Sequence, residues 1–290
     1  MNPLLMNQAT KVVVWDVQGR VWHLHGAGEG REGVRLTRQT GFMFAPATLL
    51  VAEGARQDGA TFLRSVRSKR EWDFIVLIQA DTVRGFHAIH DAWHRGWSTD
   101  IPCTVGWFTR HQGWRFQRVQ LDGGPEYLGD VDAARNGGVE YSMSATAMDP
   151  LSSHLDETGV WVNTDGLGEG VVRARNAADQ PAWARYTMNG PGRYRILDPN
   201  FAEDLTRMVE TPLLEAGEEL RIDTHPRHRT ARVYSSGDPE GRNVWAQMAG
   251  RRWFQSIDPW TSQEITVGVT GGGLDSTVRV DVSPRSSRPF

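Results

Sequence analysis

The sequence predicts a mainly β protein of two β-sandwich domains, residues 1–150 and 151–290. Apolar and polar residues alternate over many short segments, which is the pattern of half-buried strands. The 31 glycines and 14 prolines suit the turns that join such strands. A strong helical period occurs at residues 81–97, and we expect that helix to pack on the sheet of the first domain.

Composition narrows the class of protein. A length of 290 residues suits two ordinary domains, and the formal net charge is -3, with acidic and basic residues nearly balanced in each half. This balance argues against direct nucleic-acid recognition and against binding to an anionic membrane. Cys103 is the single cysteine, so no intrachain disulfide can form, and we expect a buried thiol. The sequence shows neither a signal peptide nor a membrane span of ~20 apolar residues.

The first domain reads as a series of strands around one helix. A hairpin is predicted over residues 11–24, with Gly19 in its turn. The further predicted strands are residues 34–38, 48–52, 61–66, 71–78, 103–109, 114–121 and 139–147. Asp149-Pro150 is interpreted as the exit from this domain.

The helix at residues 81–97 should seal the core of the first domain. Asp81 is its expected N-cap. Its apolar stripe consists of Val83, Phe86, Ile89, Trp93 and Trp97. His90 and His94 share a face, as metal-binding pairs do, but no third ligand can be identified. A solvated or half-buried helix face is therefore favoured over a metal site.

In the second domain, residues 176–233 look like one sheet of a sandwich. The other predicted strands are residues 159–162, 170–174, 243–248, 252–254, 264–270 and 277–283, with a hairpin around 235–241 and a short helical segment at 202–209. Asp179 and Asp223 should bond backbone amides at strand ends. Trp183 and Trp245 are expected in the core, whereas Trp260 should be exposed.

No enzyme, cofactor or metal site is predicted. Gly28-x-Gly30-x-x-Gly33 has the spacing of a dinucleotide fingerprint, but the residues that follow alternate like a strand and do not begin a helix. The carboxylates are scattered, and no serine lies in a Gly-x-Ser-x-Gly turn. A cell-wall hydrolase, which would need two carboxylates roughly 5–10 Å apart, is the least favoured hypothesis.

Short motifs in the second domain resemble a known family. They are Asn176-x-x-Asp179-x-Pro181-x-Trp183, Gly190-Pro191-Gly192, and Gly217-Glu218-x-Leu220-x-Ile222-Asp223-Thr224 followed by Arg229-Thr230-x-Arg232. With these motifs the chain resembles the distal tail proteins (Dit-like minor tail proteins) of long-tailed, siphovirus-type bacteriophages. The likeness is most specific in the second domain.

The resemblance implies a structural role in the virion. Such proteins, made in the host cytoplasm, form a ring, usually a homo-hexamer, at the tail tip. The first domain makes the ring, and the second is a galectin-like sandwich. The ring joins the tail tube protein and the tape-measure protein to the tail-tip hub, or tail-associated protein, of the baseplate. The family supplies no catalytic residue.

A carbohydrate-binding adhesin that contacts host surface glycans is the alternative hypothesis. Trp260 is its candidate contact, because an exposed indole can stack on the apolar face of a sugar. His225, Arg227, Asn243 and Trp245 have residue types found in galectin sugar sites, but neither their order nor their spacing matches. A galectin-type sugar site is therefore not predicted.

Overall fold

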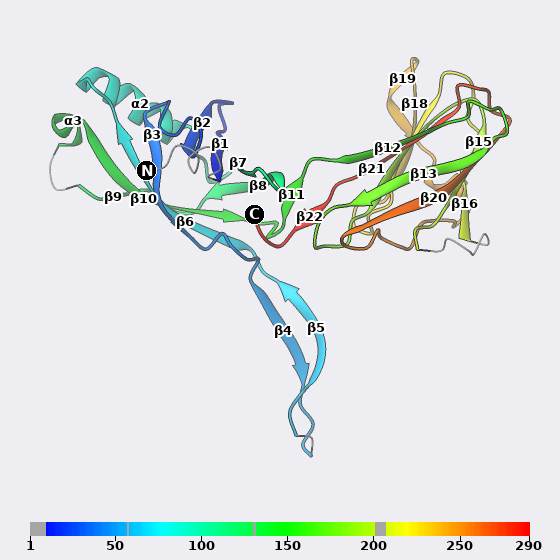
Figure 1. Ribbon diagram of the computed structural model, residues 1–290, viewed down its shortest axis with the longest axis horizontal. Helices are drawn as coiled ribbons and strands as arrows, with labels where there is room; N and C mark the ends of the chain where they lie inside the picture. The colour runs from blue at the N-terminus through cyan, green and yellow to red at the C-terminus, as the bar shows by residue number, and fades with distance from the viewer. Residues whose placement is uncertain (1–9, 57, 130–131, 201–206) are drawn as a thin grey trace. The chain divides into compact units, whose positions relative to one another are not determined.

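The computed structural model describes residues 10–56, 58–129, 132–200 and 207–290 (Figure 1). Its elements are mainly β, with antiparallel pairing, and this confirms the predicted fold class. Two compact units are present. Unit 1 runs to His154 and also includes Ser286–Phe290, whereas unit 2 is Leu155–Arg285. The last residues, which sequence reasoning placed in the second domain, thus return to unit 1.

Unit 1 contains a ten-stranded sheet whose main order is β2-β1-β7-β8-β10-β6-β3. These strands are β1 (Lys11–Trp15), β2 (Val21–His25), β3 (Val34–Thr40), β6 (Arg70–Gln79), β7 (Cys103–Thr109), β8 (Gly113–Leu121) and β10 (Gly138–Ala147). Three short strands complete the sheet: β9 (Glu126–Tyr127), β11 (Ser152–His154) and β22 (Arg285–Ser286).

The sheet has two halves, β2-β1-β7-β8 and β10-β6-β3, which enclose one core. They join where β8 meets β10, through the pairs Leu121 with Ala145 and Gln120 with Thr146. Buried side chains from both halves belong to one apolar cluster, whose members include Val12, Val14, Trp22, Leu24, Trp72, Phe74, Val76 and Trp107. Backbone bonds tie the chain end to this unit, since Ala45 N donates to Ser287 O at 3.0 Å.

Helix α2 (Val83–Arg95) covers this core, as predicted. Phe86 and Trp93 are buried in the apolar cluster. The expected cap is wrong: Thr82 is the N-cap, and its side chain accepts a hydrogen bond from Gly85 N. A second, four-residue helix, α3 (Ala133–Asn136), was not expected because it is too short to show a period.

Unit 2 is a sandwich of a six-stranded and a four-stranded sheet. The larger sheet has the order β12 (Glu157–Val162), β21 (Thr277–Val282), β14 (Ala184–Asn189), β17 (Glu219–Asp223), β18 (Thr230–Ser235) and β19 (Asp238–Asn243). The smaller has the order β13 (Glu169–Asn176), β20 (Thr261–Thr270), β15 (Arg193–Leu197) and β16 (Met208–Glu210). Side chains of both sheets form one core cluster.

Three expectations for this unit are corrected. Residues 176–233 contribute to both sheets, because β15 and β16 pair with β20 while β14, β17 and β18 lie in the larger sheet. Residues 243–248 are not a strand, since the chain turns into the 3-10 helix η2 (Trp245–Met248). Of the helical segment expected at 202–209, residues 201–206 lie outside the described residues, and Met208 begins β16.

Candidate functional site

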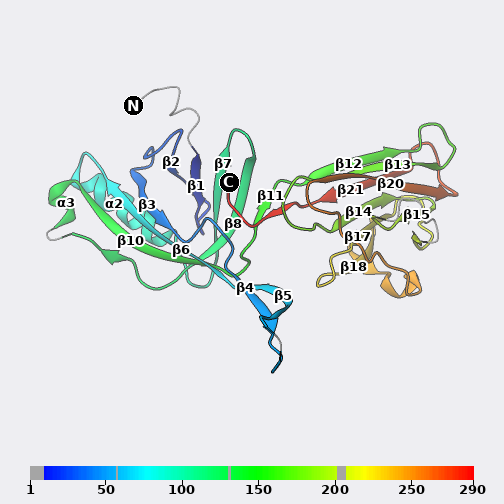
Figure 2. The same ribbon diagram turned by 60° about the horizontal axis from the view of Figure 1, so that its bottom comes forward.

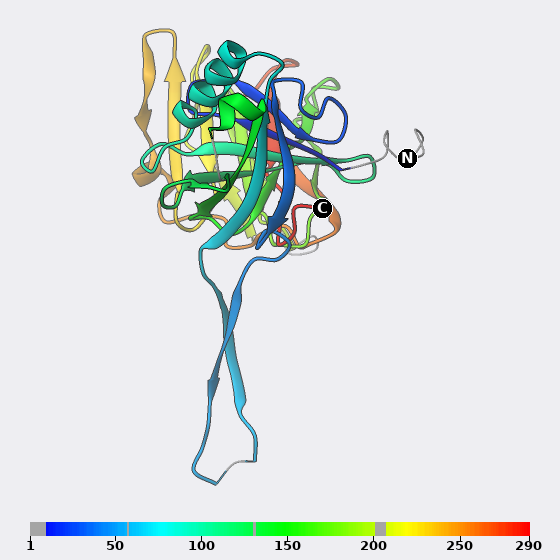
Figure 3. The same ribbon diagram turned by 90° about the vertical axis from the view of Figure 1, so that its left-hand side faces the viewer.

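The most exposed secondary structure of unit 1 is a separate β-hairpin, which we call the arm. It consists of β4 (Ala47–Ala52) and β5 (Thr61–Arg67), which form a two-stranded sheet of their own. Figures 2 and 3 show the arm leaving the body of unit 1. Every residue of both strands is exposed to solvent.

The arm carries apolar side chains on both faces. Val51 pairs with Phe62, and Leu49 lies two residues away on the same face, whereas Leu50 and Val66 occupy the other face. Leu49 is 64% exposed and Phe62 is 59% exposed. A two-stranded sheet with solvent on both faces is marginally stable in water, and an exposed apolar surface of this kind marks a contact site.

The arm was not foreseen from the sequence. Its two strands were predicted at 48–52 and 61–66, but their pairing as a separate, exposed hairpin was not. A signal was present in Leu49-Leu50-Val51 and Phe62-Leu63, where consecutive apolar residues supply both faces. Such runs equally suit a strand that is covered on both sides within one chain.

In unit 2, three of the polar motif residues lie at strand ends and bond the backbone. Asn176 is fully buried, and its Nδ2 donates to Gln180 O at 2.8 Å and to Ile257 O at 3.0 Å. Asp179 lies in the same loop, where its Oδ1 accepts a bond from Gln180 Nε2. The hydroxyl of Thr224 donates to Ala184 O at 2.7 Å, and Asp223 Oδ1 accepts from His225 N at 2.8 Å.

The Gly190-Pro191 step is also a close backbone approach. Its peptide bond is cis, and Gly190 N donates to Glu218 O at 2.7 Å. A Cβ at Gly190 would lie 1.9 Å from Glu215 O, so no larger residue fits without a backbone shift.

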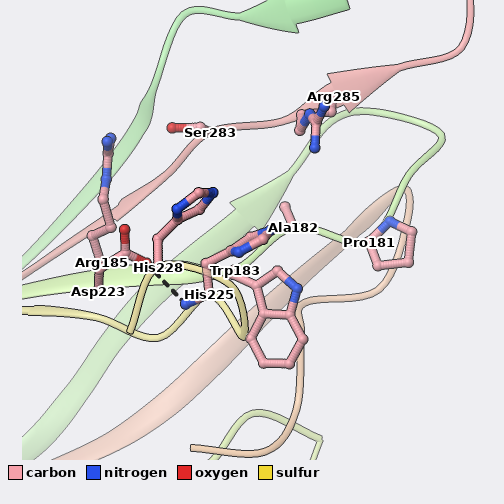
Figure 4. Close-up of a pocket in the computed structure, with 9 residues that line it drawn as sticks. All are labelled: Pro181, Ala182, Trp183, Arg185, Asp223, His225, His228, Ser283 and Arg285. Atoms are coloured by element: carbon pink, nitrogen blue, oxygen red, sulfur yellow. Dashed lines mark hydrogen bonds between the residues drawn. The ribbon is translucent and has the colours of Figure 1, made fainter. Parts of the chain in front are cut away.

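Three of the motif residues meet at a small pocket of about 180 Å³. Pro181, Trp183 and Asp223 line it. Figure 4 shows His225 and His228 side by side there, with ring centroids 5.0 Å apart. Burial and the neighbouring His228 lower the pKa of His225. Because Arg185 at its wall pairs with Asp156, part of the positive charge is neutralised within the fold.

The tryptophans of unit 2 differ in exposure. Trp253 is buried and stacks on Tyr186 with centroids 5.0 Å apart. Trp183 and Trp245 were expected in the core but are half-buried, because one lies beside the His225 turn and the other follows the end of β19. Trp260 is 64% exposed and has a left-handed φ of 59°.

His90, His94 and Cys103 are the titratable groups of unit 1 that the sequence suggested. Within the described residues, no three His, Cys, Asp or Glu side chains are placed to hold a metal ion. His90 Nε2 and the Tyr141 hydroxyl are 2.8 Å apart, and burial together with the charge of His90 lowers the pKa of His94 to about 4. Burial and the carboxylate of Asp16 raise the pKa of the Cys103 thiol to about 12, so this thiol is a poor nucleophile.

The glycine-rich loop does not have the strand-loop-helix order of a dinucleotide-binding motif. After Gly33 the chain enters strand β3, as expected, so no helix begins at this loop. The N-terminal turn of α2, with Thr82 and Gly85, lines the same surface hollow but follows β6 in the chain. No helix of the described residues is long and apolar enough to cross a membrane.

Acid is expected to destabilise unit 1 through His94. Its pKa of about 4 in the folded chain lies below the ordinary 6.5, so the unfolded chain binds more protons between these values. Stability from this group is therefore complete above pH 6.5 and is lost as the pH falls towards 4. Between pH 6.5 and 4, the free energy of unfolding measured with denaturant should fall by about 2 kcal/mol more for the wild type than for His94→Gln. Equal pH profiles for the two proteins would contradict the assignment.

A comparison with known proteins finds a relative that spans most of the chain. The minor tail protein Gp27 of Mycobacterium phage L5 is 24% identical over 318 aligned positions, covering 90% of this chain and 92% of the relative. No family model matches the sequence.

Solved structures with the same fold also span both units. The Dit (gp 19.1) protein of SPP1 aligns with a TM-score of 0.62 and 10% identity, covering 96% of this chain and 99% of that protein. It is described as a paradigm of the hub adsorption apparatus in phages that infect Gram-positive bacteria. A chain of the phage P2 baseplate, in its activated conformation with calcium, aligns with a TM-score of 0.53 and 8% identity over 95% of this chain and 98% of its own length.

Proposed function

The chain is a homologue of a phage minor tail protein and has the fold of a distal tail protein, and from this premise we propose that it is a structural protein of the phage tail tip. Copies of unit 1 assemble into a ring, a hexamer in the simplest case. The ring joins the tail tube and tape-measure proteins to the tail-tip hub. The agreement over both units with a hub adsorption protein carries this proposal.

The arm supplies the contact between copies of the chain. Each of its strands has one edge without a strand partner among the described residues, and both faces are apolar. Exposed edges and faces of this kind favour pairing with another chain. A second copy is the occupant that closes the contact, because in a ring every arm meets an identical neighbour.

Assembly and location can be tested together. The purified full-length chain, alone and mixed with tail tube and hub proteins of the same phage, should give rings by light scattering and negative-stain microscopy. Antibodies against the chain should label the tail tip of intact virions. The proposal would be refuted if the chain stays monomeric in every mixture, or if the antibodies label the capsid and not the tail tip.

A second candidate function is contact with host glycans. The 64% exposure of Trp260, a flat apolar side chain, favours it. Trp260→Ala should then weaken adsorption of the phage to its host and leave tail assembly unchanged. Unchanged adsorption would exclude this residue as the contact.

A further inference from the structure

A second pocket of unit 2, of about 370 Å³, has three arginines and a tryptophan on its wall and no acidic residue. We call it the arginine pocket. Its lining residues are Arg229, Thr230, Arg232, Asn243, Trp245 and Arg252. Strands β18 and β19 and the helix η2 bring these residues together, since Arg232 pairs with Asn243 across the sheet edge.

The charge of this pocket differs from that of the surrounding surface. Most arginines of unit 2 lie within 4.0 Å of a carboxylate: Arg175, Arg185, Arg193, Arg195, Arg207, Arg221, Arg242, Arg251 and Arg279. Among the described residues, no carboxylate lies this close to Arg229, Arg232 or Arg252. The fold therefore gathers three uncompensated cations at one place.

The pocket arginines are positioned by contacts that leave their charge in place. Arg232 Nη1 donates to the carbonyl oxygens of Glu240 and Gly241, at 3.1 and 2.8 Å. The guanidinium of Arg252 lies over the Phe254 ring, 4.6 Å from its centroid. The Nε of Arg229 is buried and has no hydrogen-bond partner among the described residues. Such a buried donor is costly, and a ligand oxygen would satisfy it.

Trp245 adds a flat apolar surface to this cationic wall. Its backbone N donates to Asn243 Oδ1 at 2.9 Å, which fixes the start of η2 on the end of β19. Guanidinium groups bind carboxylates and phosphates through paired hydrogen bonds, and an indole packs against the apolar face of a sugar ring. The combination suits a ligand that presents an anion and a ring at once.

We infer that the arginine pocket binds a saccharide that carries a carboxylate or phosphate group. Arg229 and Arg252 hold the anion, Arg232 adds positive charge, and Trp245 contacts the sugar ring. The pocket around His225 is a weaker candidate, because Asp223 lines it and Arg185 is already paired there. This binding goes beyond the structural role and does not require ring formation.

The test uses the full-length chain and matched ligands. A hyaluronan tetrasaccharide supplies sugar carboxylates, its carboxyl-reduced form is the neutral counterpart, and inorganic phosphate is an anion without a ring. Calorimetric titration should detect the acidic tetrasaccharide and not the neutral one. The double variant Arg229→Gln/Arg252→Gln should weaken binding by about 30-fold.

The control removes the same charge from paired arginines. Arg242→Gln/Arg251→Gln loses two cations whose partners are Glu218 and Glu210, and should change affinity by no more than about 3-fold. Trp245→Ala should weaken binding of the acidic tetrasaccharide and leave binding of phosphate unchanged. If a double variant lowers the melting temperature, the single variant Arg252→Gln is compared with the wild type instead.

Four outcomes would overturn the inference. They are no binding of the acidic tetrasaccharide by the wild type, equal affinity for its neutral form, equal losses in the two double variants, and a Trp245→Ala variant with unchanged tetrasaccharide affinity. Binding of an acidic peptide in preference to the tetrasaccharide would likewise assign the pocket to a protein partner.

Discussion

Replacing Leu49 and Phe62 together by aspartate is expected to abolish self-assembly of the chain and leave its two units folded. Both side chains lie on one face of the arm and are mostly exposed in the single chain. In the proposed ring this face is buried against a neighbouring copy. Losing two large apolar contacts removes about 4 kcal/mol per interface, or roughly 1,000-fold in affinity, and buried carboxylates add a further penalty.

Light scattering measures the effect, with circular dichroism as the check on folding. Leu167→Asp is the matched control, because Leu167 is 78% exposed in unit 2 and lies outside the arm. The control should assemble like the wild type. A Leu49→Asp/Phe62→Asp protein that still forms rings, or a control that dissociates as well, would contradict the role of the arm.

Trp93→Ala is expected to unfold unit 1 at moderate temperature. Trp93 is fully buried in the core, 5.3 Å from Trp22 between ring centroids, and its Nε1 contacts Met143 Sδ at 3.2 Å. Emptying such a site costs about 3–5 kcal/mol, a large part of the stability of an ordinary domain. Calorimetry should show an early transition for unit 1 and an unchanged one for unit 2.

Trp253→Ala is the reciprocal variant. Trp253 is 2% exposed in the core of unit 2 and stacks on Tyr186. Its loss should destabilise unit 2 by a similar free energy, so that the transition temperature of unit 2 falls and that of unit 1 is unchanged. If either substitution shifts both transitions together, the units do not unfold independently, and the proposed division into two domains is wrong.

Local patterns predicted the elements well where one face of an element meets a core. The helix α2 followed from its aromatic stripe, since Phe86 and Trp93 are buried where the period places them. The strands β20 and β21 followed from strict alternation, with Val267 and Val280 on the buried face. These patterns record which residues face a core, and that is a property of the local sequence.

Partners of the strands could not be predicted in this way. β20 and β21 are consecutive and alternate alike, yet one lies in the smaller sheet of the sandwich and the other in the larger. The arm has strand-like sequence but pairs only with itself among the described residues. The chain end returns to unit 1 through bonds such as Ala45 N to Ser287 O. Each of these depends on contacts between residues far apart in the chain.

The same distinction between local sequence and distant contacts applies to the candidate sites. The sequence by itself determined a mainly β chain with one long amphipathic helix, and short motifs such as Asn176-x-x-Asp179 pointed to phage tail proteins. Only the tertiary structure decided that the arm stands free and that Arg229, Arg232 and Arg252 share one pocket. The physical reason is that burial leaves a periodic record along the chain, whereas exposure of a hairpin and convergence of charges depend on how distant strands pack.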